Sequence, residues 1–233
     1  MMRRALLSFV AACLPLAPAV AQADQPDWAG LSTYRQQDAD LAARGSAAHR
    51  VVFMGDSITQ GWDRDHQTLF ADPRRINRGI SGQTTGQMLL RFRQDVIALR
   101  PETVVLLAGT NDIAGNTGDT DDATIRGNIQ SMAELARAAG IRVVLVSILP
   151  ADHYWWAPKV DPVARIAATN QWLRDYAARG RLAYVDLFTP LLGTKGAIDP
   201  RYSRDGVHPN AAGYAVMERA IGPVLAAATG GRQ

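Results

Sequence analysis

The sequence predicts an α/β fold in which helices cover both faces of a parallel sheet, giving three layers. Two observations predict it. The strand-like runs, such as residues 102–109 and 141–149, are almost continuously apolar, as expected for strands that are buried on both faces. These runs alternate along the chain with segments of helical spacing, and such alternation is typical of parallel strands joined by right-handed crossovers.

The expected elements follow one another in regular order from residue 28. Strand-like runs lie at residues 50–55, 74–80, 102–109, 141–149 and 181–187, and the run at 74–80 is the weakest of them. Helical spacing covers residues 28–44, 84–99, 121–140 and 162–180, and a closing helix is expected from about Asn210. One domain therefore accounts for all of them.

The first 21 residues have the pattern of an export signal. Arg3 and Arg4 precede an apolar stretch, and Ala19-Val20-Ala21 is a small-x-small cleavage site. We therefore expect residues 1–21 to be a signal peptide and residues 22–233 to form a single domain in the periplasm or outside the cell. The sequence VAAC at residues 10–13 leaves a lipidated Cys13 as the alternative.

Charge and cysteine content exclude several classes of function. Without the two arginines of the signal, 23 of the 25 Lys and Arg residues remain against 22 Asp and Glu residues, a net charge of +1. We therefore expect no nucleic-acid partner and no stable membrane insertion. Cys13 is the only cysteine, so a mature chain would have no thiol nucleophile, disulfide or cysteine metal site.

Residues that can carry chemistry follow the predicted strands. Ser57 follows the first strand in GDSITQG, Gly82 follows the second in GISGQTTG, and Asn111 follows the third in GTNDIAGN. In parallel α/β sheets, ligands bind beyond the carboxyl ends of the strands. We therefore expect these three residues to lie together.

Ser57 stands where a strand turns into a helix. A serine there can attack an acyl carbon while its own N–H helps to hold the oxyanion. The alternative is that Asp56 or Ser57 only caps the helix. Thr59 stands where the nucleophile elbow G-x-S-x-G requires its second glycine, so an ordinary α/β-hydrolase is not expected.

Gly82 and Asn111 are suited to binding an oxyanion. A glycine lets its backbone N–H approach a ligand, and the amide of an asparagine is a neutral donor. Each also has a purely local interpretation, namely a loop glycine with positive φ and an asparagine that stabilises a turn.

Asp205 and His208 lie three residues apart in RYSRDGVHPN, just before the closing helix. The carboxylate can orient the imidazole, and the imidazole can take a proton from a nucleophile and return it to a leaving group. The alternative is that His208 is a surface residue ahead of a helix opened by Pro209 and Asn210.

With the blocks G-D-S-I, S-G-Q-T, G-T-N-D and D-G-V-H-P-N in this order, the sequence resembles the SGNH, or GDSL, hydrolase family. The resemblance covers residues 50–220. It implies a flavodoxin-like fold with five parallel strands and hydrolysis of carboxylic esters without a metal or cofactor. It also implies that Ser57 is the nucleophile, His208 the base and Asp205 its partner, and that Ser57, Gly82 and Asn111 form the oxyanion hole.

An aromatic run follows the fourth strand, in HYWWAP at residues 153–158. It predicts a wall for an acyl group or a platform for a sugar ring; the alternative is a loop that folds onto the body of the protein. His153 is a further possible pocket residue, whereas Asp112 is expected to hold its loop. The expected substrate-binding residues are Asp56, Trp62, Tyr154, Trp155 and Trp156.

Together these observations favour a secreted serine esterase that acts on short acyl esters, such as an acetyl ester of a carbohydrate or of a small alcohol. A lysophospholipase or thioesterase of the same fold is the alternative. Two other classes remain open: a flavodoxin-like binding module that uses the glycine-rich turns, and a metal site that includes Asp205 and His208. The oligomeric state does not follow from the sequence.

Overall fold

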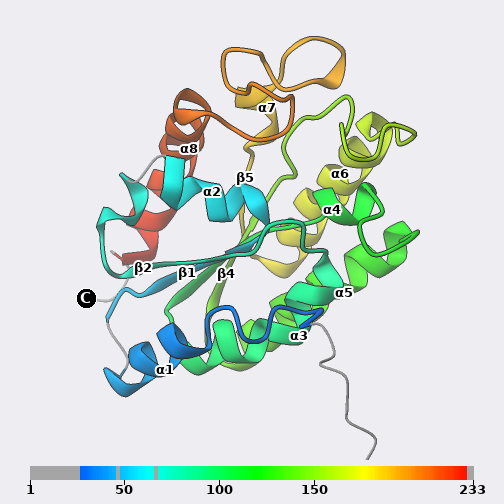
Figure 1. The fold of residues 1–233 in the computed structure, drawn as a ribbon. Coiled ribbons are helices and arrows are strands. Elements are labelled where there is room, and N and C mark those ends of the chain that lie inside the picture. Colours follow the sequence, from blue (N-terminus) through cyan, green and yellow to red (C-terminus); the bar gives the residue numbers. More distant parts are fainter. Residues whose placement is uncertain (1–26, 46–47, 66–67, 230–233) are drawn as a thin grey trace, which may run out of the picture.

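The computed structural model describes residues 27–45, 48–65 and 68–229. At its centre is a five-stranded parallel sheet with the order β2-β1-β3-β4-β5, and helices lie on both faces (Figure 1). The strands are β1 (Val51–Gly55), β2 (Arg75–Gly79), β3 (Thr103–Leu107), β4 (Arg142–Val146) and β5 (Ala183–Val185). The predicted three-layer α/β fold is confirmed. The expected signal peptide and Cys13 lie outside the described residues.

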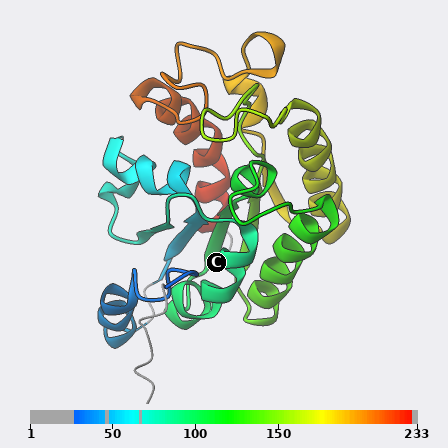
Figure 2. The ribbon, with the colours of Figure 1, turned by 45° about the vertical axis from the view of Figure 1, so that its right-hand side comes forward.

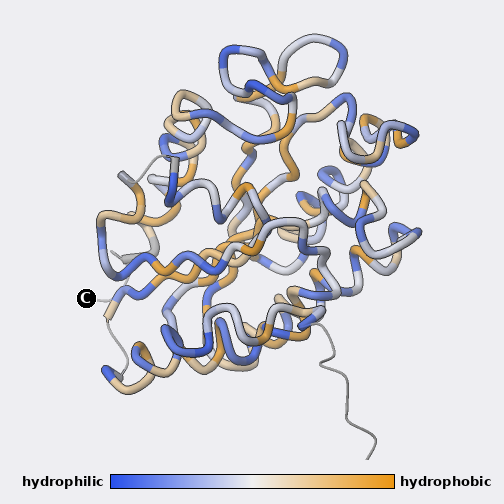
Figure 3. The backbone as a smooth tube through the Cα atoms, viewed as in Figure 1, coloured by the Kyte–Doolittle hydropathy of each residue, from blue (hydrophilic) through white to orange (hydrophobic). Residues whose placement is uncertain are grey.

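Two apolar cores lie on the two faces of the sheet, because alternate side chains of each strand point to opposite sides. Along β1, Val52 and Met54 belong to one core, whereas Val51 and Phe53 belong to the other. Figure 3 shows apolar residues along the central strands, whereas β2, with the sequence RINRG, is largely hydrophilic. This double burial explains why β1 and β3 are apolar almost throughout.

The helices divide between these two cores (Figures 1 and 2). One face is covered by α1 (Arg35–Ala43), α3 (Thr85–Asp95), α5 (Asp122–Ala138) and α6 (Val163–Gly180). The other is covered by α2 (Ser57–Asp65), α7 (Phe188–Leu191) and α8 (Ala211–Thr229). The remaining short elements are α4 (Thr110–Ile113) and the 3-10 helices Leu69–Ala71, Ile97–Leu99 and Thr194–Gly196.

The first helix is shorter than its sequence pattern predicts. Residues 28–34 form turns, and the helix begins only at Arg35. Gly30 has a φ of 68°, which no α-helix accommodates, and Asp27 accepts hydrogen bonds from the backbone N–H groups of Leu31 and Ser32 at 2.8 and 2.7 Å. These local bonds replace the first helical turns.

Short connections join the carboxyl ends of β1 and β3 to the helices that carry residues of the candidate site. Helix α2 begins at Ser57, two residues after β1 ends, and α4 begins at Thr110 shortly after β3. A side chain at Gly79, the last residue of β2, would collide with the backbone N of Gln60. The absence of a side chain there lets α2 pack directly against β2.

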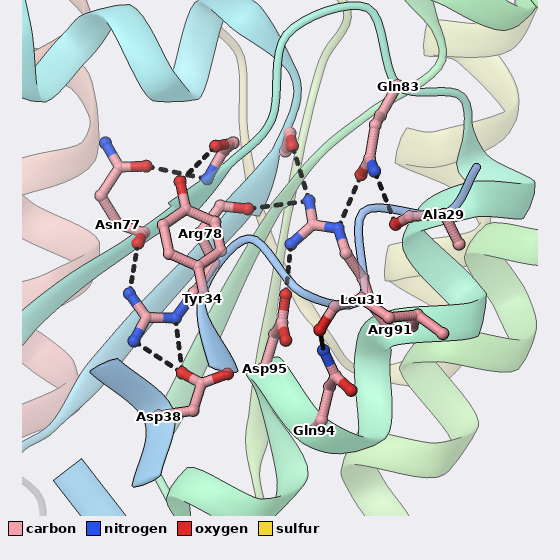
Figure 4. A network of polar contacts seen from close by, with 12 residues as sticks. Ala29, Leu31, Tyr34, Asp38, Asn77, Arg78, Gln83, Arg91, Gln94 and Asp95 are labelled. Atoms are coloured by element: carbon pink, nitrogen blue, oxygen red, sulfur yellow. Dashed lines mark hydrogen bonds and ion pairs between the residues drawn. The ribbon is translucent and has the colours of Figure 1, made fainter. Parts of the chain in front are cut away.

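A buried polar network connects the start of the described chain to α3 and β2 (Figure 4). Arg78 binds Asp38 with an N–O distance of 2.7 Å, and the Gln83 side chain donates to the carbonyl of Ala29 at 2.8 Å. The hydroxyl of Tyr34 donates to the carbonyl of Gly79. Residues 29–38 are thereby attached to the sheet.

No helix in the described parts of the chain has the length and apolar character needed to cross a membrane.

Candidate active site

Ser57, His208 and Asp205 form a continuous chain of hydrogen bonds. Ser57 Oγ lies 2.9 Å from Nε2 of His208, and Nδ1 of His208 lies 2.7 Å from Oδ2 of Asp205. Ser57 is the first residue of α2, while His208 and Asp205 come from the loop before α8. The fold thus brings together two segments that are 151 residues apart in sequence.

The loop that carries Asp205 is held by its own polar groups. Oδ1 of Asp205 accepts from the backbone N–H groups of His208 at 2.8 Å and of Val207 at 3.0 Å. Ser203 donates its hydroxyl to the same oxygen at 3.2 Å and accepts from the N–H of Gly206 at 3.0 Å. These bonds fix the carboxylate relative to the imidazole.

The environment of Asp205 keeps it ionised. Burial acts to raise its pKa, but the hydrogen bonds from the backbone and the imidazole of His208 and from the N–H of Val207 outweigh burial and lower the pKa to about 2. An ionised Asp205 only accepts hydrogen bonds, so Nδ1 of His208 carries the proton. Nε2 is then free to accept the proton of Ser57.

Ser57, Gly82 and Asn111, the three residues that the sequence suggests as oxyanion donors, line one pocket. The N–H of Ser57 lies at the start of α2. Gly82 has a φ of 76°, a backbone conformation that residues other than glycine rarely adopt. Nδ2 of Asn111 donates to the carbonyl of Gln83 at 3.0 Å and has a longer contact of 3.4 Å with Asp56 Oδ2. One of its two N–H groups is therefore only weakly engaged.

A hollow of about 180 Å³ opens beside the serine. It is lined by residues from five separate loops or helix starts: Ser57, Ser81, Gly82, Asn111, Asn116, Trp155, Trp156 and His208. A second groove, of about 390 Å³, lies against His208 and Asp205 and is also lined by Arg204, Pro209, Asn210 and Ala211. The four sequence blocks therefore meet at one place.

Asp56 lies beneath the site and not in the hollow. Its side chain is buried, and Oδ1 accepts from the N–H of Ile58 at 2.9 Å. Burial raises its pKa to about 6. Asp56 thus caps the first turn of α2, in agreement with the local interpretation of the sequence, and it does not contact a ligand in the hollow.

Trp62 also lies away from the hollow, against the expectation that it binds substrate. It is buried in one of the two cores, where its ring stacks on Tyr214 at 5.8 Å and meets Phe53 edge-on at 6.0 Å. Five residues of helix turn the chain by about 140° from Ser57. When Ser57 faces the site, Trp62 therefore faces the sheet.

The aromatic run divides between the core and the hollow. Tyr154 is fully buried in the core on the face of the sheet that α6 covers. Trp155 is 63% exposed and meets Trp156 edge-on, and the Trp156 ring lies 6.3 Å from the His208 ring. Only the two tryptophans are placed to contact a substrate.

The other residues singled out in the sequence are close to the site without lining the hollow. Asp112 accepts from the N–H and the hydroxyl of Thr85 at 2.9 and 2.6 Å and so holds its loop as expected. His153 pairs with Asp152 and lies over Gly206 in the loop of Asp205.

Two residues that line the hollow were not identified as candidates from the sequence. Ser81 and Asn116 lie within the GISGQTTG and GTNDIAGN segments, one residue before Gly82 and five residues after Asn111. Their place in predicted loops beyond the sheet was the available signal. In the part of the chain that the structure describes, no three His, Cys, Asp or Glu side chains are grouped so that they could hold a metal ion.

Comparison with known proteins shows the family to which the chain is related. The model of the GDSL-like lipase/acylhydrolase family matches residues 53–216. The chain is 30% identical over 197 residues to Esterase TesA of Pseudomonas aeruginosa, covering 79% of this chain and 92% of the relative. It is 27% identical to an acetylxylan esterase of Geobacillus stearothermophilus, over 64% of this chain and 70% of the relative.

Solved structures of GDSL-like lipases and acylhydrolases have the same fold as this chain. A GDSL-like lipase from Bacteroides thetaiotaomicron superposes with a TM-score of 0.82 at 41% identity, covering 86% of this chain and 98% of that one. A candidate acylhydrolase from Bacteroides fragilis superposes with a TM-score of 0.84 at 43% identity, covering 88% and 100%. The chain belongs to the GDSL-like lipase/acylhydrolase family and is a carboxylic ester hydrolase.

Proposed function

We propose that this protein is a serine esterase that cleaves short acyl esters through Ser57, His208 and Asp205. The observation that carries the proposal is the 2.9 Å distance between Ser57 Oγ and His208 Nε2, with Asp205 on the far side of the imidazole. A serine hydroxyl becomes a useful nucleophile only when a base is within hydrogen-bond reach.

In the proposed reaction, Ser57 Oγ attacks the acyl carbon while its proton passes to Nε2 of His208. The oxyanion that forms is stabilised by the N–H groups of Ser57 and Gly82 and by Nδ2–H of Asn111. When the intermediate collapses, the ester C–O bond breaks and the alcohol leaves with the proton held by His208. A water molecule then attacks the acyl carbon and gives a proton to His208; the bond between the acyl carbon and Ser57 Oγ breaks, Ser57 regains the proton from His208, and the carboxylic acid is released.

Two features support a preference for short acyl chains. The hollow beside Ser57 measures only about 180 Å³, and Trp155 and Trp156 close one side of it. A relative is an acetylxylan esterase, which supports acetylated carbohydrates among the substrates. Long-chain acylhydrolysis, of the lysophospholipase or thioesterase kind, is the alternative, and it requires acyl chains to extend beyond this hollow.

We also propose that the protein is exported and that residues 22–233 form one domain. The support for export is the arginine pair, apolar stretch and Ala19-Val20-Ala21 at the start of the sequence, together with a Bacillus subtilis relative that is an uncharacterized lipoprotein. Mass spectrometry of the secreted or periplasmic protein tests this, since we expect an N-terminus at or near Gln22. A lipid on Cys13 would instead indicate a membrane anchor.

The activity is tested by hydrolysis of nitrophenyl acetate, butyrate, octanoate and palmitate and of acetylated xylose. We expect the highest kcat/KM with acetyl and butyryl esters. Ser57→Ala should reduce activity to near background without unfolding the protein, whereas Ser131→Ala, on the exposed side of α5, should leave it unchanged. A fluorophosphonate should label Ser57. Appreciable activity in Ser57→Ala would contradict the assignment of the nucleophile.

A further inference from the structure

Asn116 contacts two of the three residues that we assign to the oxyanion hole. Its Nδ2 donates to the carbonyl of Gly82 and to Oδ1 of Asn111, both at 2.9 Å. A carboxamide nitrogen carries two hydrogens, so both bonds form at the same time. Asn116 thereby links the loop after β2 to the loop after β3, directly beside the oxyanion donors.

The indole of Trp156 determines which way the Asn116 side chain points. Its Nε1 lies 2.9 Å from Oδ1 of Asn116, and an indole N–H can only donate. The reverse orientation of Asn116 would place its NH₂ group against this N–H. It would also place Oδ1 of Asn116 against two acceptors, the Gly82 carbonyl and Oδ1 of Asn111, so the observed orientation satisfies every group.

The same chain of hydrogen bonds also orients the side chain of Asn111. Because its Oδ1 accepts from Asn116, its Nδ2 faces the Gln83 carbonyl at 3.0 Å and Asp56 Oδ2 at 3.4 Å. One N–H is occupied by Gln83, and the other has only the long contact with Asp56, so the second N–H is the one available to an oxyanion. Rotation of the Asn111 amide by 180° would present an oxygen instead and would repel the developing charge.

We propose that Asn116 and Trp156 are positioning residues that hold Asn111 and Gly82 in the geometry needed to stabilise the oxyanion. This role rests on the proposed esterase function. It gives Trp156 a second task besides lining the hollow: its ring faces the substrate, while its N–H acts through Asn116 on the oxyanion hole.

The surroundings limit the size of the effect. The Gln83 carbonyl and Asp56 favour the same orientation of Asn111, so loss of Asn116 loosens the amide without reversing it. Asn116 is exposed and Trp156 is partly exposed, so water can replace their bonds in the free protein. We therefore expect a loss of about three- to tenfold in kcat for each variant, the range of one ordinary hydrogen bond, and little change in stability.

The experiment uses Trp156→Phe, which keeps an aromatic wall and removes the N–H, and Asn116→Ala. Trp172→Phe is the matched control, because Trp172 lies on α6, stacked on Tyr176, away from the site. Both test variants should lower kcat for acetyl and butyryl esters by the same factor and leave KM and the melting temperature unchanged. Their affinity for a trifluoromethyl ketone, whose adduct with Ser57 carries an oxyanion, should fall by a similar factor. The control should match the unmodified protein.

Double variants separate positioning from wall formation. If the indole N–H acts through Asn116, then Trp156→Phe should cost nothing further in an Asn116→Ala background, and Asn116→Ala should cost less in an Asn111→Ala background. Undiminished losses in these backgrounds, or a change confined to KM or chain-length preference, would overturn the proposal. If the unmodified protein is active and both single variants retain its kcat, only the positioning role fails. If the unmodified protein hydrolyses no ester, the proposed function fails and the positioning role fails with it.

Discussion

Both carboxylate oxygens of Asp205 accept a hydrogen bond from the same residue, His208. Oδ1 accepts from its backbone N–H at 2.8 Å, and Oδ2 binds its Nδ1 at 2.7 Å. The first bond fixes the loop, so the second can fix the imidazole ring. A carboxylate that rotated to release the ring would also lose its backbone donors, and the pairing is therefore rigid.

Asp205→Asn should lower kcat by about a thousandfold or more. An amide has one oxygen, so either the backbone N–H of His208 or its Nδ1–H loses its acceptor. If the NH₂ group faces Nδ1, the proton moves to Nε2, which can no longer accept the proton of Ser57. Ester hydrolysis at fixed pH measures the loss. Asp199→Asn is the control, since that carboxylate pairs with Arg201 in the preceding loop.

The Asp205→Asn effect should disappear when Ser57 is replaced. Because Asp205 acts through His208 on Ser57, the Ser57→Ala/Asp205→Asn double variant should be no less active than Ser57→Ala alone. A further large loss in the double variant would mean that Asp205 contributes to a reaction that does not pass through the serine.

Asn111→Ala should reduce kcat by about a hundredfold to a thousandfold, roughly 2.7 to 4 kcal/mol of transition-state stabilisation, with a smaller effect on KM. The amide matters most when charge develops on the oxygen, so the loss should be concentrated in kcat. Asn111 is buried, and its removal leaves the Gln83 carbonyl without this donor. A melting curve must therefore accompany the kinetics, and equal losses in kcat and in folded fraction would contradict a role in the oxyanion hole.

The fold and the meeting of the site residues could be predicted because their signals are local. The apolar runs mark strands, and in a parallel sheet all residues that follow strands come to one edge. The length of the first helix could not be predicted, because Gly30 and the Asp27 side chain compete with helical bonds that the apolar spacing favours. The short helices α4 and α7 leave no periodic pattern to recognise.

Individual side chains at the site were harder to predict. Ile58 and Trp62 lie four residues apart in α2, and this spacing identifies the face that packs on the sheet, so the burial of Trp62 was open to prediction. Tyr154 and Trp155 lie in an irregular loop, where no period separates a buried ring from an exposed one. The contacts of Asn116 depend on three loops meeting in space, which no local pattern encodes.

Trp155→Ala should change the chain-length preference and leave stability almost unaltered. The ring is 63% exposed and lines the hollow beside Ser57, so its removal opens the wall without leaving a cavity in the core. We expect kcat/KM for octanoyl esters to rise relative to acetyl esters. The ratio of the two rates, together with the melting temperature, measures this, and an equal loss on all esters would mean that the loop only supports the site.

Asp56→Asn should change how stability depends on pH. Burial raises the pKa of Asp56 to about 6, against a value near 4 in an unfolded chain. Between these values the folded protein keeps a proton that the unfolded chain has lost, so the free energy of unfolding falls as pH rises from about 4 to 6. Asparagine does not ionise, so the free energy of unfolding of the variant should rise relative to that of the unmodified protein over this range, by up to about 3 kcal/mol. Urea unfolding at several pH values measures the difference, and parallel curves would contradict it.

The ion pair between Arg91 and Asp95 is buried, so it can show how burial changes the contribution of an ion pair to stability. Their N–O distance is 2.7 Å and both side chains are fully buried, whereas Arg74 and Asp72 pair at the same distance on the surface. Arg91 also donates to the Gln83 side chain at 2.6 Å and to the carbonyls of Gly55 and Arg78 at 3.1 and 2.9 Å (Figure 4).

Arg91→Met should therefore destabilise the protein by about 3 to 5 kcal/mol, because it leaves the Asp95 carboxylate buried without its cation. Adding Asp95→Leu should recover part of this loss, since the unpaired charge is then removed, but not all of it, because the hydrogen bonds from Arg91 to the Gly55 and Arg78 carbonyls are still lost. Arg74→Met should hardly change the midpoint of urea unfolding, since an exposed pair contributes little. Equal effects of Arg91→Met and Arg74→Met would show that the buried network does not hold α3 to the strands that carry the site.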